Sequence, residues 1–307
     1  MSLIEKAAAK LKKSESLVER AAKKIKHSSI VKSENAASGE EKQAAPVLKS
    51  AQMPVDEKAV KNSAHVELNF GVLEKNNIII DDDMNSSVTT EEFRIVKRSL
   101  LLNAFAKGDS AIKNGNIVLV TSTQPDEGKT FCAISLAMSM AAERDLTVLL
   151  VDADVSKSDV LNTLGIEGNK GLIDVIEDKN MDLSECLLKT NIPNLTILPA
   201  GKKHKLTTEL LASERMGEII DEIARRYRDR IIIIDSPPVL ASSSASVLAL
   251  HVGQILYVVE AERTREEELK DALKMIEKSK NINFLLNKTR FTAGRKKFGS
   301  YYGYGYN

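Results

Sequence analysis

Short uninterrupted runs of isoleucine, valine and leucine recur along the second two-thirds of this 307-residue chain. Such runs are typical of strands that are covered on both faces, because neither face then has to be polar. We predict strands at residues 117–121, 147–151, 195–198, 231–234, 255–259 and 284–286.

Longer stretches between these runs carry apolar residues three or four positions apart, which is the spacing of one helix face. A helix at residues 91–106, with Thr89 or Thr90 as its cap, precedes the first strand. Strands that alternate with helices favour right-handed crossovers, so we expect an α/β fold, a parallel sheet with helices on both faces. Further helices are predicted at residues 129–144, 207–227, 243–251 and 265–278.

The first 88 residues have a different character and are rich in lysine, alanine, serine and glutamate. Residues 2–26 can form a basic helix with an apolar side, which suits either a partner- or membrane-docking helix or a solvated, partly helical leader. Residues 28–65 offer too little apolar surface to offset the entropy of ordering, so we predict a disordered linker there. We therefore divide the chain into a basic leader and linker (1–88), a compact domain (89–290) and a flexible tail (291–307).

A phosphate-binding loop follows the first predicted strand, where the chain reads Thr-Ser-Thr-Gln-Pro-Asp-Glu-Gly-Lys-Thr over residues 121–130 and then opens a helix. A loop in this position gathers backbone N–H donors and the positive end of the helix dipole. Gly128 permits close approach, Lys129 can reach the outer phosphates and the Thr130 hydroxyl can bind Mg²⁺. We therefore expect a P-loop NTPase-like sheet that binds ATP. The predicted nucleotide-binding residues are Thr123, Gln124, Pro125, Asp126, Glu127, Gly128, Lys129, Thr130 and Phe131.

Two features of this loop depart from the general pattern. Thr123 stands where a first glycine would be, and Asp126 brings a negative charge towards the phosphates. Aspartate tolerates the left-handed backbone better than most residues, so the loop can keep its shape. The charge is expected to weaken anion binding.

Asn287 and Lys288 end the last predicted strand, a position at which P-loop folds contact purines.

Acidic residues end two further predicted strands, at Asp152 and Asp154 and at Asp235. The carboxyl ends of parallel strands face the crevice in which ligands bind. Carboxylates there suit a hard cation such as Mg²⁺, and we predict Thr130, Asp152 and Asp235 as its ligands. Asp152 or Asp154 would orient the attacking hydroxyl and help to take its proton. The predicted catalytic residues are Lys129, Asp152 and Asp154.

Four of the six tyrosines lie in the last seven residues, separated by two glycines. Glycine leaves the backbone free and the neighbours have no apolar period, so this tail is not expected to form a core. It is either a low-complexity terminus without chemistry or a set of substrate tyrosines. A nucleotide site in the same chain favours self-phosphorylation, at Tyr301, Tyr302, Tyr304 and Tyr306.

Composition excludes several other functions. The net charge of +1 argues against nucleic acid as a partner. No apolar run approaches the roughly 18 residues of a membrane helix, so no transmembrane segment is expected, and the N-terminus lacks the apolar stretch of a secretory signal. Cys132 and Cys186 form neither a metal-ligand pattern nor a disulfide framework, which indicates small buried residues and a cytoplasmic protein.

Taken together, these motifs resemble the bacterial tyrosine kinases of polysaccharide export, and most of all the exosortase-associated tyrosine autokinases. The resemblance extends over residues 89–307 and includes the start of the leader. It implies an ATP- and Mg²⁺-dependent autokinase that phosphorylates C-terminal tyrosines between subunits and regulates exopolysaccharide polymerisation and export. The matching segments are 123–130, 151–154, 231–238 and the tyrosine tail.

The resemblance also implies partners. The family's subunit-contact motif, Glu-x-x-Arg-x-x-Arg, matches Glu91 and Arg94, with Lys97 in its last position. A homo-oligomer is therefore expected. A membrane polysaccharide co-polymerase that controls chain length is implied as a second partner, which would recruit this cytoplasmic protein to the inner face of the membrane.

Two departures from the family leave alternatives open. Asp126 replaces a glycine, and Ser156 replaces an arginine for which Lys157 can compensate. These changes favour, as an alternative, a nucleotide-sensing scaffold with little kinase activity. A partition-type ATPase is a further alternative, but such proteins usually carry a lysine early in the P-loop, and residues 122–124 here are Ser-Thr-Gln.

Overall fold

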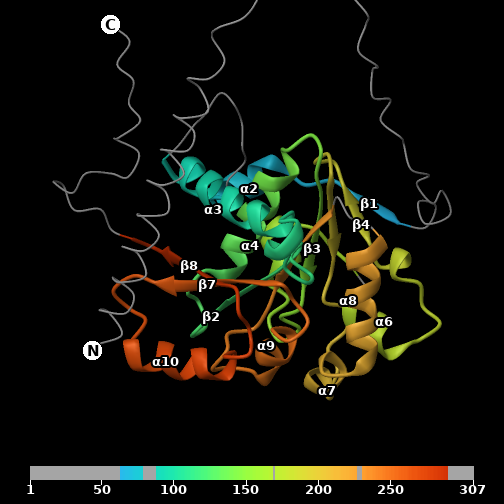
Figure 1. Cartoon of the computed structure of the whole chain (residues 1–307). Coiled ribbons are helices and arrows are strands. Elements are labelled where there is room, and N and C mark those ends of the chain that lie inside the picture. Colours follow the sequence, from blue (N-terminus) through green and yellow to red (C-terminus); the bar gives the residue numbers. More distant parts are fainter. Residues whose placement is uncertain (1–62, 79–87, 169, 227–229, 290–307) are drawn as a thin grey trace, which may run out of the picture. The chain divides into compact units, whose positions relative to one another are not determined.

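A sheet of eight strands lies at the centre of the computed structural model (Figure 1). The structure describes residues 63–78, 88–168, 170–226 and 230–289. The strand order is β1-β4-β5-β3-β6-β2-β7-β8, and each neighbouring pair is parallel except β4 and β5. The strands are β1 Ala64–Val66, β2 Ile117–Ser122, β3 Thr147–Asp152, β4 Leu188–Thr190, β5 Leu195–Leu198, β6 Arg230–Asp235, β7 Gln254–Glu260 and β8 Ile282–Asn287.

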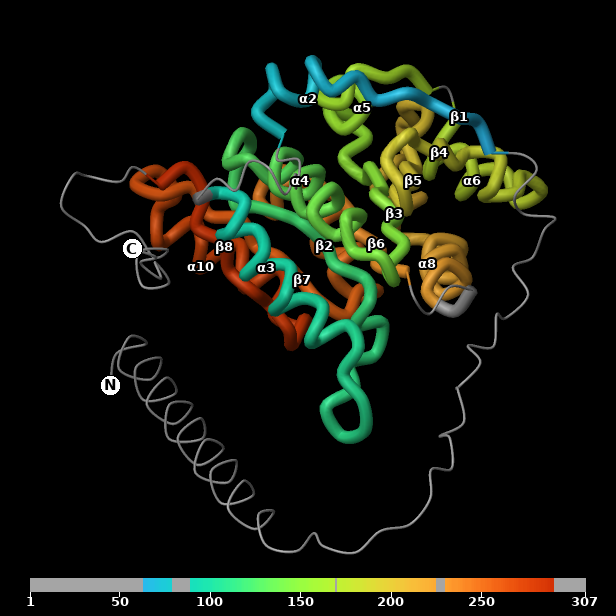
Figure 2. The backbone as a smooth tube through the Cα atoms, turned by 90° about the horizontal axis from the view of Figure 1, so that it is seen from above, coloured from blue at the N-terminus to red at the C-terminus, as the bar shows by residue number. Residues whose placement is uncertain are grey.

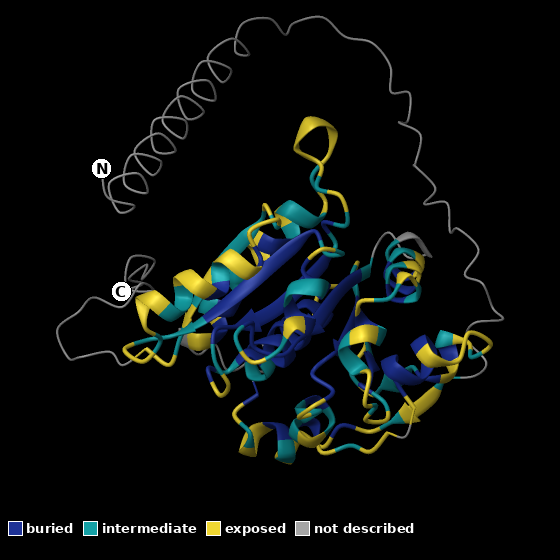
Figure 3. Ribbon diagram, turned by 90° about the horizontal axis from the view of Figure 1, so that it is seen from below, coloured by how far each residue is buried: buried dark blue, intermediate teal, exposed yellow. Residues whose placement is uncertain are grey.

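Helices cover both faces of the sheet, as the sequence predicts (Figures 1 and 2). One apolar cluster joins one face of the sheet to α2 to α5, and a second cluster joins the other face to α6 to α10. The central strands are buried from both sides (Figure 3). The α-helices are α2 Phe70–Lys75, α3 Val88–Ala104, α4 Lys129–Ala141, α5 Asp159–Leu164, α6 Leu172–Glu177, α7 Thr207–Leu211, α8 Glu214–Arg226, α9 Ser243–Leu248 and α10 Glu266–Met275.

The folded unit begins earlier than the boundary we placed between residues 88 and 89. Strand β1 pairs with β4, and Leu68, Leu73 and Ile78 are buried in the core. The Asn191 side chain accepts from the Leu68 N–H at 2.9 Å and donates to its carbonyl, which pins this segment to the sheet. A strand of three residues is too short to leave a periodic pattern, so composition alone assigned part of this segment to the linker.

Two local features also differ from the predicted elements. The short strand β4 was not predicted, and its antiparallel pairing with β5 makes the sheet mixed. The helix predicted over residues 207–227 is interrupted between α7 and α8. Ser213 lies at the break, where its hydroxyl donates to the Leu210 carbonyl at 2.6 Å and accepts from the Met216 N–H at 3.3 Å. Serine is a strong helix-capping residue, and it starts α8 here.

Several predictions concern residues that the structure does not describe. The basic leader, the linker up to residue 62 and the four tail tyrosines lie outside the described ranges. Among the helices of the described ranges, none has both the length and the apolar character needed to cross a membrane.

Candidate functional site: a phosphate-binding crevice

The predicted phosphate loop connects β2 to the first turn of α4. Gly128 precedes that turn with φ of +94°, a left-handed conformation that favours glycine. A Cβ at this position would lie 2.2 Å from Asn287 Nδ2, so any other residue would displace the Asn287 side chain from the loop. Asp126 has φ of +67°, in line with the expected tolerance of aspartate for this region.

Glu127 holds the loop together from within. Its buried carboxylate accepts from the Thr123 N–H at 2.6 Å and from the Gln124 N–H at 2.9 Å through one oxygen. The other oxygen accepts from the Thr264 hydroxyl, on the segment after β7. Sequence reasoning counted Glu127 only as one loop residue among others. The partner at Thr264 lies far along the chain, so no local pattern could have indicated this role.

The end of β8 supports the same loop from outside. Asn287 Nδ2 donates to the Glu127 carbonyl at 2.9 Å, and Lys288 Nζ donates to the Asp126 carbonyl. This is the position at which P-loop folds contact purines. In this structure both side chains bind the backbone of the loop, and the loop conformation therefore depends on β8.

Lys129 lies at the centre of the crevice, between carboxylates. Its Nζ is 2.8 Å from Asp154 Oδ2, and the two side chains are only 7% and 4% exposed. Burial lowers the pKa of Lys129, but the charges of Asp235, Asp154 and Asp152 outweigh it and hold the pKa above its usual value. Burial raises the pKa of Asp154, and the ion pair with Lys129 outweighs that effect and lowers it. Both groups of the pair are therefore charged at neutral pH.

Thr130 and Asp235 form the part of the site that can hold Mg²⁺. The Thr130 hydroxyl donates to Asp235 Oδ2 at 2.7 Å, while Asp235 Oδ1 is buried without a hydrogen-bond partner. Within the described ranges, no three His, Cys, Asp or Glu side chains are grouped to hold a metal by themselves. Mg²⁺ usually takes one or two carboxylates together with water and substrate phosphates. The unpartnered Asp235 oxygen and the Thr130 hydroxyl therefore fit the protein's share of such a site.

Asp152 lies beside Asp235, because β3 and β6 are neighbours and these two residues are register partners. Its oxygens accept from the N–H groups of Asp154 and Val160 at 3.1 and 3.4 Å. Burial and the nearby Asp235 raise the pKa of Asp152 to about 8. Burial also raises the pKa of Asp235, to about 6 against the lowering effects of Lys129 and Thr130. Two carboxylates so close in a buried site favour a cation between them.

A cavity of about 450 Å³ opens over these groups. Lys129, Thr130 and Asp154 line it, together with the Pro237–Pro238 segment after β6. The predicted loop residues Pro125 and Phe131 are also in its wall. Asp152 and Asp235 lie beneath, fully buried.

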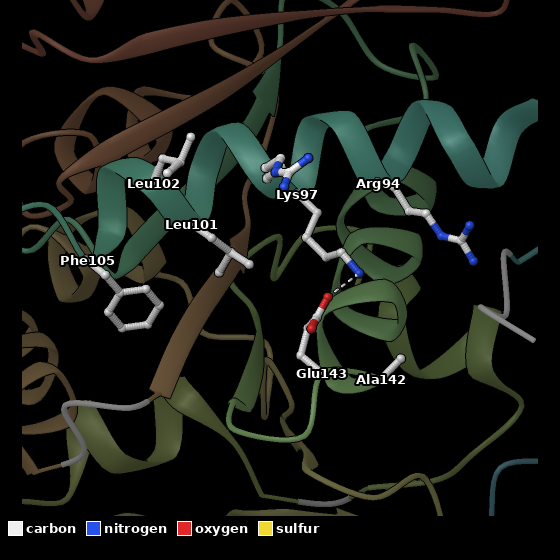
Figure 4. A pocket seen from close by; sticks show the side chains of 8 residues that line it. Arg94, Lys97, Leu101, Leu102, Phe105, Ala142 and Glu143 are labelled. Atoms are coloured by element: carbon white, nitrogen blue, oxygen red, sulfur yellow. Dashed lines mark ion pairs between the residues drawn. The ribbon is translucent and has the colours of Figure 1, made fainter. Parts of the chain in front are cut away.

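The predicted subunit-contact residues lie on α3, and the Arg94 and Lys97 side chains point in different directions (Figure 4). Glu91 and Arg94 form an exposed pair one turn apart. Lys97 instead points towards the end of α4, where its Nζ donates to the Ser139 carbonyl at 3.0 Å and lies 2.8 Å from Glu143. A pocket of about 700 Å³ lies along this face, lined by Arg94, Lys97, Arg98, Leu101, Leu102, Phe105, Ala142 and Glu143.

The two cysteines are buried and free, as expected. Burial raises the pKa of Cys132 to about 12 and that of Cys186 to about 11, which keeps both thiols protonated. Neither is placed for thiolate chemistry.

The fold and the loop together define a nucleotide-binding α/β domain of the P-loop type. The model of the AAA domain family matches residues 115–288, more than half of the chain, and the chain belongs to this family.

Known relatives confirm the predicted resemblance to bacterial tyrosine kinases. The tyrosine-protein kinase wzc of Salmonella typhimurium is 31% identical over 194 residues, which is 62% of this chain and 26% of that protein. This chain thus spans about a quarter of that relative's length. The tyrosine-protein kinase CpsD of Streptococcus agalactiae is 29% identical over 231 residues, which is 74% of this chain and 95% of that protein.

Solved structures agree with the fold. The kinase domain of the Escherichia coli tyrosine kinase ETK aligns with a TM-score of 0.59 at 26% identity, over 74% of this chain and 84% of that one. The kinase domain of VpsO aligns with a TM-score of 0.55 at 28% identity, over 67% and 96% of the two chains.

Proposed function

We propose that this protein is an ATP-dependent protein-tyrosine autokinase, which phosphorylates C-terminal tyrosines between subunits. The observation that carries the proposal is the convergence of Lys129, Thr130, Asp154 and Asp235 in one crevice, in a chain that ends in four closely spaced tyrosines. The relatives named tyrosine-protein kinases support it.

The reaction transfers the terminal phosphoryl group of ATP to a tyrosine oxygen. The new bond joins that oxygen to phosphorus, the bond from phosphorus to the bridging oxygen of ADP breaks, and the tyrosine loses its proton. The transition state is loose, so positioning and charge matter more than a strong base. The backbone N–H groups of the loop and Lys129 would bind the phosphates.

Asp154 is the better placed of the two candidate acceptor residues, because it lines the cavity while Asp152 lies beneath it. Asp154 would orient the tyrosine hydroxyl and accept its proton. Asp152 accepts a hydrogen bond from the Asp154 N–H, so it positions the segment that carries Asp154.

Thr130 and Asp235, with Asp152 behind them, would hold Mg²⁺. When bound, Mg²⁺ supplies positive charge against the charge that develops on the phosphate oxygens.

Transfer between subunits requires an oligomer, for which Glu91 and Arg94 on α3 are candidate contacts. Each phosphate adds about −1.5 to −2 charge to a tyrosine, so repulsion among tails would loosen the assembly.

A membrane protein that controls polysaccharide chain length is the proposed second partner. This would place the protein in the cytoplasm at the inner face of the membrane, where it would regulate exopolysaccharide polymerisation and export.

Mass analysis of the full chain after incubation with ATP and Mg²⁺ tests this function. We expect phosphate on Tyr301, Tyr302, Tyr304 or Tyr306, and none when Mg²⁺ is chelated. Nucleotide binding without phosphate transfer would favour the sensing scaffold, and release of inorganic phosphate without modified tyrosines would favour a partition-type ATPase.

A further inference from the structure

A second lysine stands at the mouth of the phosphate crevice. Lys157 lies on the turn between β3 and α5, and its Nζ donates to Asp126 Oδ1 at 2.7 Å. Asp126 belongs to the phosphate loop, and both residues line the cavity that contains Lys129. The pair therefore connects the phosphate loop to the turn after β3 in the wall of this cavity.

The shape of the loop does not depend on this ion pair. The Asp126 carbonyl is held by Lys288, and the loop N–H groups at Thr123 and Gln124 are held by Glu127. These contacts use the backbone and leave the Asp126 carboxylate available to Lys157. The carboxylate can therefore give up its lysine without unfolding the loop.

The ion pair between Lys157 and Asp126 is weak because both side chains are exposed to water. The Lys157 and Asp126 side chains are 47% and 67% exposed, whereas Lys129 and Asp154 are almost fully buried. Exposed ion pairs contribute little in water. Hydrogen bonds from an ammonium to a carboxylate and to a phosphate are both charge-assisted, so the number of acceptor oxygens and their total charge decide between the two. A nucleotide in the crevice brings several phosphate oxygens against a single carboxylate, so the exchange favours the nucleotide.

We propose that Lys157 is a phosphate-binding residue of the nucleotide site, and that Asp126 holds it at the mouth of the crevice until phosphate replaces the carboxylate. The proposal rests on the nucleotide-binding part of the proposed function. It also links the first departure from the family, the carboxylate at Asp126, to Lys157, which follows the second departure at Ser156. Ser156 itself donates to Asp154 at 2.9 Å.

If the proposal is correct, the effect of Asp126 on nucleotide affinity depends on the presence of Lys157. If the carboxylate weakens binding by competing for Lys157, its removal helps only while Lys157 is present. If it repels the phosphates directly, its removal helps equally with or without Lys157. A double-mutant cycle separates these two causes.

The test is calorimetric titration of the full chain with ADP and Mg²⁺, which avoids turnover. Lys157→Met is expected to weaken ADP binding about tenfold, or ~1.4 kcal/mol. Asp126→Asn, which tolerates the same left-handed backbone, is expected to tighten binding about threefold. The double variant is expected to bind like Lys157→Met alone.

Lys170→Met is the matched control. Lys170 is 49% exposed, its Nζ lies 3.5 Å from Glu185, and it does not line the crevice. This variant should bind ADP like the unchanged protein.

Two results would overturn the proposal: unchanged ADP affinity in Lys157→Met, or equal tightening by Asp126→Asn in both backgrounds. Lys129→Met distinguishes this failure from a failure of the proposed function. If Lys129→Met loses ADP binding while Lys157→Met keeps it, the nucleotide site stands and only the role of Lys157 is lost. If neither substitution weakens binding, the nucleotide site itself is wrong.

Discussion

Replacing Lys129 by methionine is expected to remove nucleotide binding almost completely. The lysine is buried among three carboxylates, and no other described side chain places a cation at the first turn of α4 inside the crevice. A charge-assisted contact of this kind is worth about 1.5–3 kcal/mol, so we expect affinity for ADP to fall about 100-fold, or ~2.7 kcal/mol. Tail phosphorylation should fall to background in the same variant.

A matched control for this prediction exists within the chain. Lys97 is as buried as Lys129, and its ion pair with Glu143 has the same N–O distance of 2.8 Å. Lys97→Met removes an equally buried lysine and its ion pair, and it should leave ADP affinity unchanged. Circular dichroism and thermal melting of both variants establish that they are folded. Phosphorylation at the normal level in Lys129→Met would remove the phosphate loop from the mechanism.

Asp235→Asn is expected to lower the rate of phosphate transfer by about 10²–10³, because a preorganised charge at such a site contributes roughly 3–4 kcal/mol to the barrier. The substitution keeps the shape and the hydrogen bond from Thr130, but it removes the charge of the buried oxygen that has no partner. The rate should also require more Mg²⁺. The measurement is the initial rate of phosphotyrosine formation as a function of Mg²⁺ concentration.

The Asp152→Asn variant gives the comparison. The Asp152 carboxylate already accepts two backbone N–H groups, whereas Asp235 keeps one buried oxygen without a partner. We expect a smaller loss of rate than for Asp235→Asn. If the rate at saturating Mg²⁺ is unchanged in both variants, the metal site does not lie between β3 and β6.

The central strands and the phosphate loop could be predicted from the sequence because each leaves a local signal. Strands such as β2 and β6 are buried on both faces and read as uninterrupted apolar runs. The loop is defined by adjacent residues that end in Gly-Lys-Thr. The acidic strand ends met as expected, because parallel neighbours bring Asp152 and Asp235 into register.

What the sequence could not supply are contacts between distant segments. Strand β1 has three residues and gains its stability from β4 and from Asn191. Two further contacts join residues that no local pattern connects. The Thr264 hydroxyl donates to Glu127, and Lys157 donates to Asp126. The position of Lys97 in its motif predicted a subunit contact, whereas its side chain is committed to the end of α4. Such commitments depend on packing, which sequence spacing does not determine.

The most direct test of the central claim is a mixing experiment. An inactive Lys129→Met protein with an intact tail is combined with an active protein truncated after Ser300, in the presence of ATP and Mg²⁺, and the phosphorylated residues of each chain are mapped by mass analysis. The account predicts phosphate on Tyr301, Tyr302, Tyr304 or Tyr306 of the inactive partner. Absence of phosphate from that partner, or phosphate only on Tyr227 or Tyr257, would contradict transfer between subunits to the tail.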